Sequence, residues 1–72
     1  MKEILRTNDP TVIAFSTALL RAEDIEVFVF DVHTSVLEGS IGILPRRLMV
    51  GERDAFLARS ILRDNGVEIS AG

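Results

Sequence analysis

Residues 2–10, KEILRTNDP, decide the fold of this 72-residue chain. The first part of this stretch predicts a short strand with Ile4 and Leu5 as its apolar centre. Asp9 suits the N-cap of a helix because its carboxylate can accept a backbone hydrogen bond. Pro10 suits the first helical position because its missing N–H costs nothing there. The chain is therefore predicted to open with a strand that leads directly into a helix.

Two helices are predicted from apolar residues that recur every three or four positions. The first runs from Pro10 to about Glu23. The second runs from Glu52 to Asn65, where Gly66 can take the left-handed conformation that ends a helix. The first buried stripe is predicted to comprise Val12, Phe15, Leu19 and Ala22, widened by Ala18 and Leu20. The second is predicted to comprise Ala55, Ala58, Ile61 and Leu62, joined by Phe56 or Leu57.

Three further β-rich segments, at residues 26–31, 47–50 and 67–69, are predicted to be strands. The first two strands of the chain, joined through a helix, are expected to be parallel partners. The complete order predicts an α+β fold: a ferredoxin-like two-layer sandwich, β-α-β-β-α-β, with a long ordered loop between strands 2 and 3. No repeat or linker interrupts the pattern, so residues 1–72 are predicted to form a single domain.

Composition excludes several kinds of function. The chain has no cysteine and one histidine, which argues against disulfides, thiolate metal sites and structural zinc, and we expect no metal and no cofactor. A net charge of −3 disfavours nucleic acid and anionic membranes as partners. No apolar stretch approaches the roughly 20 residues that span a bilayer, and no signal peptide is evident, so a cytoplasmic location is expected.

Catalysis finds little support in the sequence. It contains no Ser-His-Asp set at a suitable spacing, no nucleophilic cysteine and no obvious pair of carboxylates on one face. We therefore expect a protein that is not an enzyme. A chain this short buries a thin core, and self-association is the remaining route to added stability, so a homo-oligomer is expected.

The second strand is apolar on both of its faces. Val27 and Val29 alternate with Phe28 and Phe30, and Met49 adds an apolar side chain to the third strand. A two-layer sandwich covers only one face of its sheet, and which face meets the helices is left open. The other face could be covered by the chain ends and the long loop, by a second copy packed sheet on sheet, or by a ligand or partner protein. Phe28, Phe30 and Met49 are the candidate interface residues.

The connection between strands 2 and 3 is far longer than the two to five residues of an ordinary hairpin loop. His33 follows Asp31 by two positions, so a carboxylate could orient the histidine as a base, a ligand or a pH switch. The alternative is a histidine that hydrogen-bonds a neighbouring loop. The loop is too apolar for a disordered segment, which predicts an ordered excursion packed against the sheet.

The basic end of this loop is the other candidate site. Arg46 and Arg47 could hold a phosphate or a carboxylate, with backbone N–H groups from Gly39, Ser40 and Gly42. The alternative is that both arginines pair with acidic residues of the chain. The glycine pattern is not a nucleotide-binding fingerprint, because a proline and a strand follow it instead of a helix.

Residues 35–50 (SVLEGSIGILPRRLMV), together with the opening stretch 2–10, resemble a bacterial family of putative signal-transducing proteins, a domain of unknown function. The resemblance covers nearly the whole chain and implies a PII-like, ferredoxin-type fold. The leading hypothesis is a non-enzymatic regulatory or signal-transducing module, oligomeric, that binds a partner protein or a small anion near the loop. The alternative is a sensor of a small anion or nucleotide that uses residues 31–47.

Overall fold

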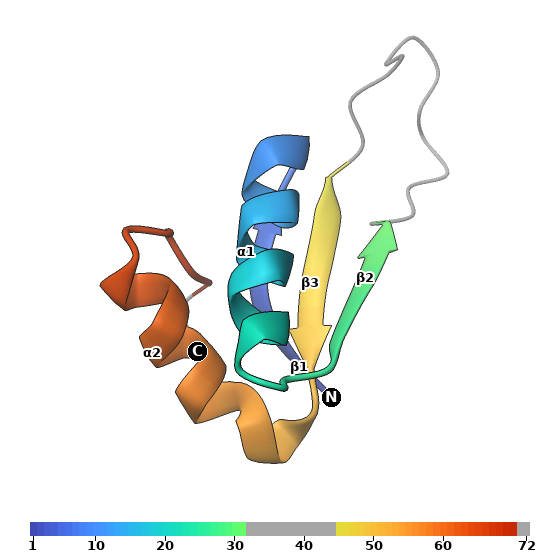
Figure 1. Cartoon of the computed structure of the whole chain (residues 1–72). Coiled ribbons are helices and arrows are strands. Elements are labelled where there is room, and N and C mark those ends of the chain that lie inside the picture. Colours follow the sequence, from blue (N-terminus) through green and yellow to red (C-terminus); the bar gives the residue numbers. More distant parts are fainter. Residues whose placement is uncertain (32–44, 71–72) are drawn as a thin grey trace, which may run out of the picture.

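The computed structural model describes residues 1–31 and 45–70 (Figure 1). Within them three strands form one sheet, and two helices lie on the same side of it. The elements in chain order are β1 (Lys2–Thr7), α1 (Pro10–Ala22), β2 (Val27–Asp31), β3 (Arg46–Val50), the 3-10 turn η1 (Glu52–Asp54) and α2 (Ala55–Asp64). The protein is therefore a small α+β fold, as the order of its elements predicted.

The sheet has the strand order β1-β3-β2, and β3 runs antiparallel to both of its neighbours. β1 and β2 therefore point the same way, as expected for two strands joined through a helix. They do not pair with each other, because β3 lies between them. β3 carries Leu48 and Val50, which are both fully buried, and a central strand is the place where such side chains lose all contact with water.

The start of α1 agrees with the sequence in detail. The Thr11 N–H donates to Asp9 Oδ1 at 2.9 Å, and the Thr11 hydroxyl donates to the same oxygen at 2.6 Å. These hydrogen bonds, the hydroxyl's first, hold the pKa of Asp9 below its usual value. Pro10 occupies the first turn, where its missing N–H leaves no hydrogen bond unmade.

The second half of the chain departs from the prediction at both ends. Residues 52–54 form a 3-10 turn, so α2 begins at Ala55 and not at Glu52. The helix ends at Asp64. Gly66 has a φ of 81°, which is the left-handed conformation expected there. The predicted last strand at residues 67–69 is not formed. The Val67 N–H instead donates to the Leu62 carbonyl at 2.9 Å, which ties the beginning of this segment to the end of the helix.

One cluster of apolar side chains between the helices and the sheet forms the core. Its fully or nearly fully buried members are Ile4, Leu5, Ile13, Leu20, Ile25, Val27, Leu48, Val50, Ala55, Ala58 and Leu62. The predicted stripe of α2 is confirmed for its two alanines and Leu62, with Ile61 partly buried, but Phe56 is 83% exposed and Leu57 is 50% exposed. Neither of those two residues joins the stripe.

The predicted stripe of α1 is confirmed in part: Leu20 is fully buried, and Val12 and Leu19 are partly buried against the core. Phe15 is 49% exposed, and Ala18 and Ala22 are exposed as well. The helix instead buries Ile13 and Ser16. Apolar residues surround this helix on nearly every side, so their spacing alone does not select one face. The selection comes from the packing against the sheet, and Ile13 and Ser16 each lie one residue beyond a predicted position.

A β-bulge in β1 explains how two successive residues of one strand are both buried. The register with β3 shifts between Glu3 and Leu5, and Ile4 is the extra residue. A bulge places two residues of one strand against one of its partner, which locally breaks the alternation of side chains. Ile4 and Leu5 are therefore both directed into the core, at 0% and 2% exposure.

Candidate functional site

The register of the sheet determines which face of β2 meets the helices. Val27 is paired with Val50, and Val29 is paired with Leu48. Directly opposite residues of an antiparallel pair share one face of the sheet. Since Leu48 and Val50 are buried beneath the helices, both valines of β2 lie on the helix side.

The other side of the sheet, which we call the open face, carries the three residues predicted to form an interface. Phe28 is paired with Met49, and Phe30 is paired with Arg47. Phe28 and Met49 are half-buried, and Phe30 is 41% exposed. The structure therefore brings Phe28, Phe30 and Met49 together on one surface, where no helix covers them. The side chains of the open face are Glu3, Arg6, Phe28, Phe30, Arg47 and Met49.

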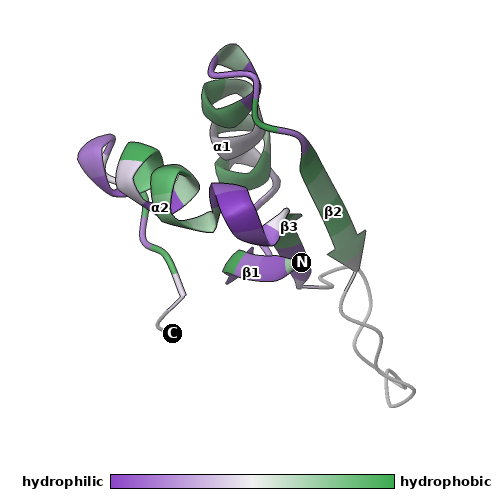
Figure 2. Ribbon diagram, turned by 90° about the horizontal axis from the view of Figure 1, so that it is seen from below, coloured by the Kyte–Doolittle hydropathy of each residue, from purple (hydrophilic) through white to green (hydrophobic). Residues whose placement is uncertain are grey.

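The open face is divided into an apolar half and a charged half. β2 is hydrophobic along its length in Figure 2, whereas β1 is largely hydrophilic. The division follows the strand order, because β1 and β2 lie at opposite edges of the sheet. A surface with an apolar part beside a charged part resembles the composition of protein–protein interfaces, in which a hydrophobic centre is bordered by polar residues.

The two arginines predicted to hold an anion together are separated by the sheet. Arg46 and Arg47 are successive residues of β3, and successive residues of a strand point to opposite faces. Arg47 lies on the open face, directly opposite Arg6 of β1. Arg6 and Arg47 therefore lie side by side on one face. The joint binding of an anion by Arg46 and Arg47 stays a prediction, because the glycines and the serine expected to complete that site lie outside the described residues.

Glu3 lies beside this arginine pair and partly neutralises it. Its Oε1 accepts a hydrogen bond from Arg6 Nη2 at 2.9 Å, and its Oε2 accepts one from the Ser70 hydroxyl at 3.1 Å. The hydrogen bond from Arg6, followed by that from Ser70 and by the positive charges of Arg6 and Arg47, holds the pKa of Glu3 below its usual value despite partial burial. Two cations and one anion leave this end of the face with net positive charge.

Sequence reasoning missed Glu3 and Arg6 as members of a site. In a regular strand, two residues three positions apart point to opposite faces. The bulge at Ile4 removes this difference and places both side chains on the open face. No local pattern in residues 2–7 announces the bulge, so only the paired strands reveal the contact.

The C-terminal segment covers the outer edge of β1. The Ser70 N–H donates to the Ile4 carbonyl at 2.8 Å, and Arg59 Nη2 of α2 donates to the Glu3 carbonyl at 3.4 Å. This edge of the sheet is therefore occupied by the protein's own chain. The arrangement also orients the Glu3 carboxylate through the Ser70 hydroxyl.

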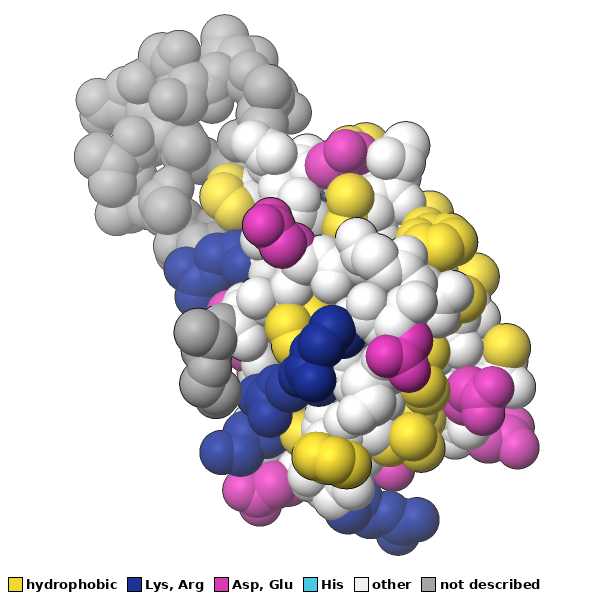
Figure 3. Space-filling model, turned by 90° about the vertical axis from the view of Figure 1, so that its left-hand side faces the viewer, with side chains coloured by type: hydrophobic (Ala, Val, Ile, Leu, Met, Phe, Trp, Pro, Cys, Tyr) yellow, Lys and Arg dark blue, Asp and Glu magenta, His cyan; other side chains and the backbone are white. Residues whose placement is uncertain are grey.

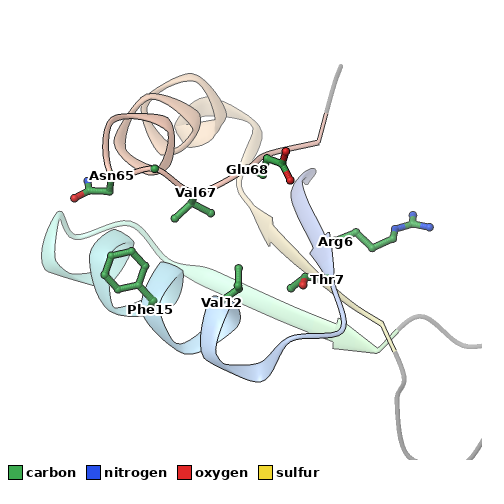
Figure 4. Close-up of a pocket in the computed structure, with 8 residues that line it drawn as sticks. Arg6, Thr7, Val12, Phe15, Asn65, Val67 and Glu68 are labelled. Atoms are coloured by element: carbon green, nitrogen blue, oxygen red, sulfur yellow. The ribbon is translucent and has the colours of Figure 1, made fainter.

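A pocket of about 330 Å³ lies where the end of β1 and the start of α1 meet the segment after α2. Figure 4 shows Val67 directed across it toward Val12 and Phe15, while Arg6 extends away from it. Two of its polar groups are already engaged: Thr7 Oγ1 accepts from the Asp9 N–H, and Asn65 Nδ2 donates to the Ile61 carbonyl. The pocket is lined by apolar and polar side chains together.

Four of the predicted ligand residues, His33, Gly39, Ser40 and Gly42, lie outside the described residues, as does most of the predicted long loop.

On the side of the molecule that carries α2, acidic, basic and apolar side chains are interspersed (Figure 3). In the described ranges no three acidic, histidine or cysteine side chains come together in a way that could hold a metal ion. Neither helix of these ranges has the length and apolar character needed to cross a membrane.

These features define a class of protein: a small two-layer α+β fold in which, among residues 1–31 and 45–70, both helices cover the same face of the sheet. Within that class the chain belongs to a family described as "putative prokaryotic signal transducing protein", domain of unknown function 2007. The sequence model of this family matches residues 1–66. The predicted resemblance is therefore confirmed. No curated protein matches the chain.

Proposed function

We propose that the protein is a non-enzymatic, signal-transducing module that works by protein–protein association through the open face of its sheet. Self-association into a homo-oligomer is part of the proposal. The family to which the chain belongs supports the signalling role in its general form. The site on which association depends is the apolar half of the open face, formed by Phe28, Phe30 and Met49.

One observation carries the proposal: aromatic and sulfur-containing side chains are gathered on a face that the helices leave uncovered. Phe30 keeps 41% of its surface exposed, although burying a phenylalanine side chain contributes about 1.5–3 kcal/mol. Apolar patches of several hundred Å² on a soluble protein commonly mark sites of interaction. The neighbouring charged half, with Glu3, Arg6 and Arg47, would give such a contact its orientation.

Light scattering over a concentration series, up to several hundred micromolar, tests the proposal. We expect an average mass above that of the monomer, and we expect Phe30→Glu to reduce it, because the change buries a charge in the contact. Phe56→Glu is the matched control, since Phe56 is 83% exposed on α2 and lies on a different surface. A monomer at every concentration, or an equal effect of the two variants, would contradict the association.

A second candidate function is the binding of a small anion by Arg6 and Arg47. Their adjacent positions on two strands favour it, as does the buried Arg47 Nε, which has no hydrogen-bond partner within the described residues. Paired arginines hold phosphate and carboxylate groups by charge-assisted hydrogen bonds. Glu3 competes for the same groups, so we expect binding to be weak.

A thermal-shift series with inorganic phosphate, a nucleotide and a dicarboxylate tests this second function. Arg47→Gln should abolish any stabilisation by these anions, whereas Arg46→Gln, on the opposite face of the same strand, should retain it. Loss of the effect in both variants, or its retention in both, would exclude a site built on the Arg6–Arg47 pair.

The strand order supports a more detailed assignment of the fold, which we include in the proposal. A ferredoxin-like sheet has the order 4-1-3-2, and β1-β3-β2 agrees with the last three of these positions. Ser70 donates to β1 on the side where a fourth strand of that fold would lie. We further propose that the protein is a PII-like module of the bacterial cytoplasm that works without a cofactor.

A further inference from the structure

β2 is an edge strand with one unpaired side. It pairs with β3, and within residues 1–31 and 45–70 no other strand pairs with it. The backbone N–H and C=O groups of its second side are therefore not used in a ladder by this part of the chain. An edge strand of this kind is a template on which another strand can form hydrogen bonds.

The two edges of the sheet differ in whether other parts of the chain donate hydrogen bonds to them. The edge at β1 is occupied by Ser70 and Arg59, which donate to the carbonyls of Ile4 and Glu3. The edge at β2 lacks three of the usual protections: its five residues include no lysine and no proline, and the register with β3 contains no bulge. Of the two edges, as residues 1–31 and 45–70 form them, the one at β2 is therefore the better suited to pairing with another chain.

β2 is also exposed and apolar on both of its faces at the same point. Val29, on the helix side, keeps 39% of its surface exposed, and Phe30, on the open face, keeps 41%. Figure 1 shows why: β2 is at the margin of the sheet, beside the helix layer instead of beneath it. A strand added next to β2 would cover apolar surface on both faces at once.

We propose that β2 pairs with β2 of a second copy of this chain, antiparallel, about a two-fold axis that passes through Val29. The inference deepens the proposed function and rests on one part of it, the self-association of the chain. The second copy is the occupant because its β2 supplies what this edge needs: an unpaired ladder and apolar side chains on both faces.

The register follows from symmetry and overlap. A two-fold axis between antiparallel strands places a residue opposite itself and keeps each face continuous with its counterpart. With Val29 opposite Val29, all five residues of β2 overlap, whereas a two-residue shift in either direction leaves the ends unpaired. Phe28 then lies opposite Phe30 of the second copy on the open face. Asp31 lies opposite Val27, so no acidic residue of the strand is placed opposite another.

This arrangement makes one continuous sheet of six strands, three from each copy. The apolar halves of the two open faces meet at the axis and form a single strip of aromatic residues. Cross-strand aromatic pairs stabilise a sheet beyond the hydrogen bonds of the ladder. A contact of this kind is smaller than the roughly 1,600 Å² of a standard interface, so we expect association in the micromolar range.

Disulfide cross-linking tests the register, because the natural chain has no cysteine. Val29→Cys places two thiols opposite each other with Cα atoms about 4.5–5.5 Å apart, within the roughly 4.4–6.8 Å that a disulfide accepts. Phe28→Cys is the matched control, because its two copies would be diagonal neighbours about 7–8 Å apart. Phe56→Cys, on the exposed face of α2, measures random collision.

We expect mild oxidation to convert most of the Val29→Cys protein to a covalent dimer, at least fivefold more than either control, on non-reducing gels. Light scattering of the unmodified chain should show a dimer under the same conditions. If the chain associates but Val29→Cys cross-links no better than the controls, the strand pairing is wrong and the proposed function stands. If the chain is a monomer at every concentration, both are wrong. Efficient cross-linking through Met49→Cys alone would indicate sheet-on-sheet packing and overturn the strand pairing.

Discussion

Arg6 of β1 and Arg47 of β3 lie directly opposite each other on the open face of the sheet, although 40 positions of the chain separate them. Two guanidinium groups in this position repel each other unless an anion lies near, and Glu3 provides one by accepting a hydrogen bond from Arg6 at 2.9 Å. The negative charge of Glu3 therefore reduces the repulsion between the two arginines on the charged half of the open face.

Glu3→Gln should destabilise the protein at neutral pH by roughly 1 kcal/mol, because it removes the anion beside the two arginines. The pKa of Glu3 is lowered in the folded protein, chiefly by the hydrogen bond from Arg6. Its contribution is therefore fully present above the ordinary pKa of 4.5 and is lost as the pH falls through the lower folded value. Urea denaturation at a series of pH values measures the difference between the two proteins.

The expected signature is a difference in unfolding free energy that is present at pH 7 and closes as the pH falls below the ordinary pKa of 4.5. Glu26→Gln is the control, since it removes the same charge at an exposed position just before β2. A difference for Glu3→Gln that is unchanged between neutral and acidic pH would show that the carboxylate does not act as an anion here.

Leu62→Ala and Leu57→Ala compare two leucines of the same helix. Leu62 is fully buried against the sheet, and its truncation should cost about 2–5 kcal/mol through lost burial and the cavity that remains. Leu57 is 50% exposed, and its truncation should cost less than about 1 kcal/mol. Chemical denaturation gives both values, and similar costs would mean that α2 packs on the sheet with a different face.

Ser16→Ala should stabilise the protein by about 1 kcal/mol. Ser16 is fully buried in α1, and its hydroxyl has no hydrogen-bond partner among the described residues, so its burial costs free energy that the alanine avoids. Alanine is also the better helix former. The control is Ala18→Ser on the exposed side of the same helix, which should cost no more than about 0.5 kcal/mol. A lower denaturation midpoint for Ser16→Ala would reveal a partner for the hydroxyl.

Asp9→Ala should lower the thermal unfolding midpoint, because it removes the cap that accepts hydrogen bonds from Thr11. The decrease should be smaller than that for Leu62→Ala, which leaves a cavity in the core. Asp9→Ser should retain most of the stability, since serine also accepts a hydrogen bond at this position. The pKa of Asp9 is lowered in the folded protein, so the effect of Asp9→Ala should diminish as the pH falls through the acidic range. Calorimetry at neutral and acidic pH measures it, and equal losses in the two substitutions would argue against capping.

The bulge in β1 shows where reasoning from the sequence stops. Glu3 and Arg6 are three positions apart, which in a regular strand places them on opposite faces. The extra residue Ile4 brings both to the open face, and it does so because β1 must match β3 while burying two successive apolar side chains. Arg46 and Arg47, which adjacency in the sequence suggested as a pair, are separated for a simpler reason: both belong to β3, and successive residues of a strand point to opposite faces.

The sequence by itself determined the features that depend on neighbouring residues: the strand at residues 2–7, the cap at Asp9, the first turn at Pro10 and the stop at Gly66. Each of these follows from backbone geometry and hydrogen bonds within a few positions. Only the tertiary structure decided the strand order, the rotation of α1 and the face that β2 turns toward the helices. Those choices depend on which apolar surfaces meet across the whole chain, and a segment such as VFVF, apolar on both sides, carries no local preference between them.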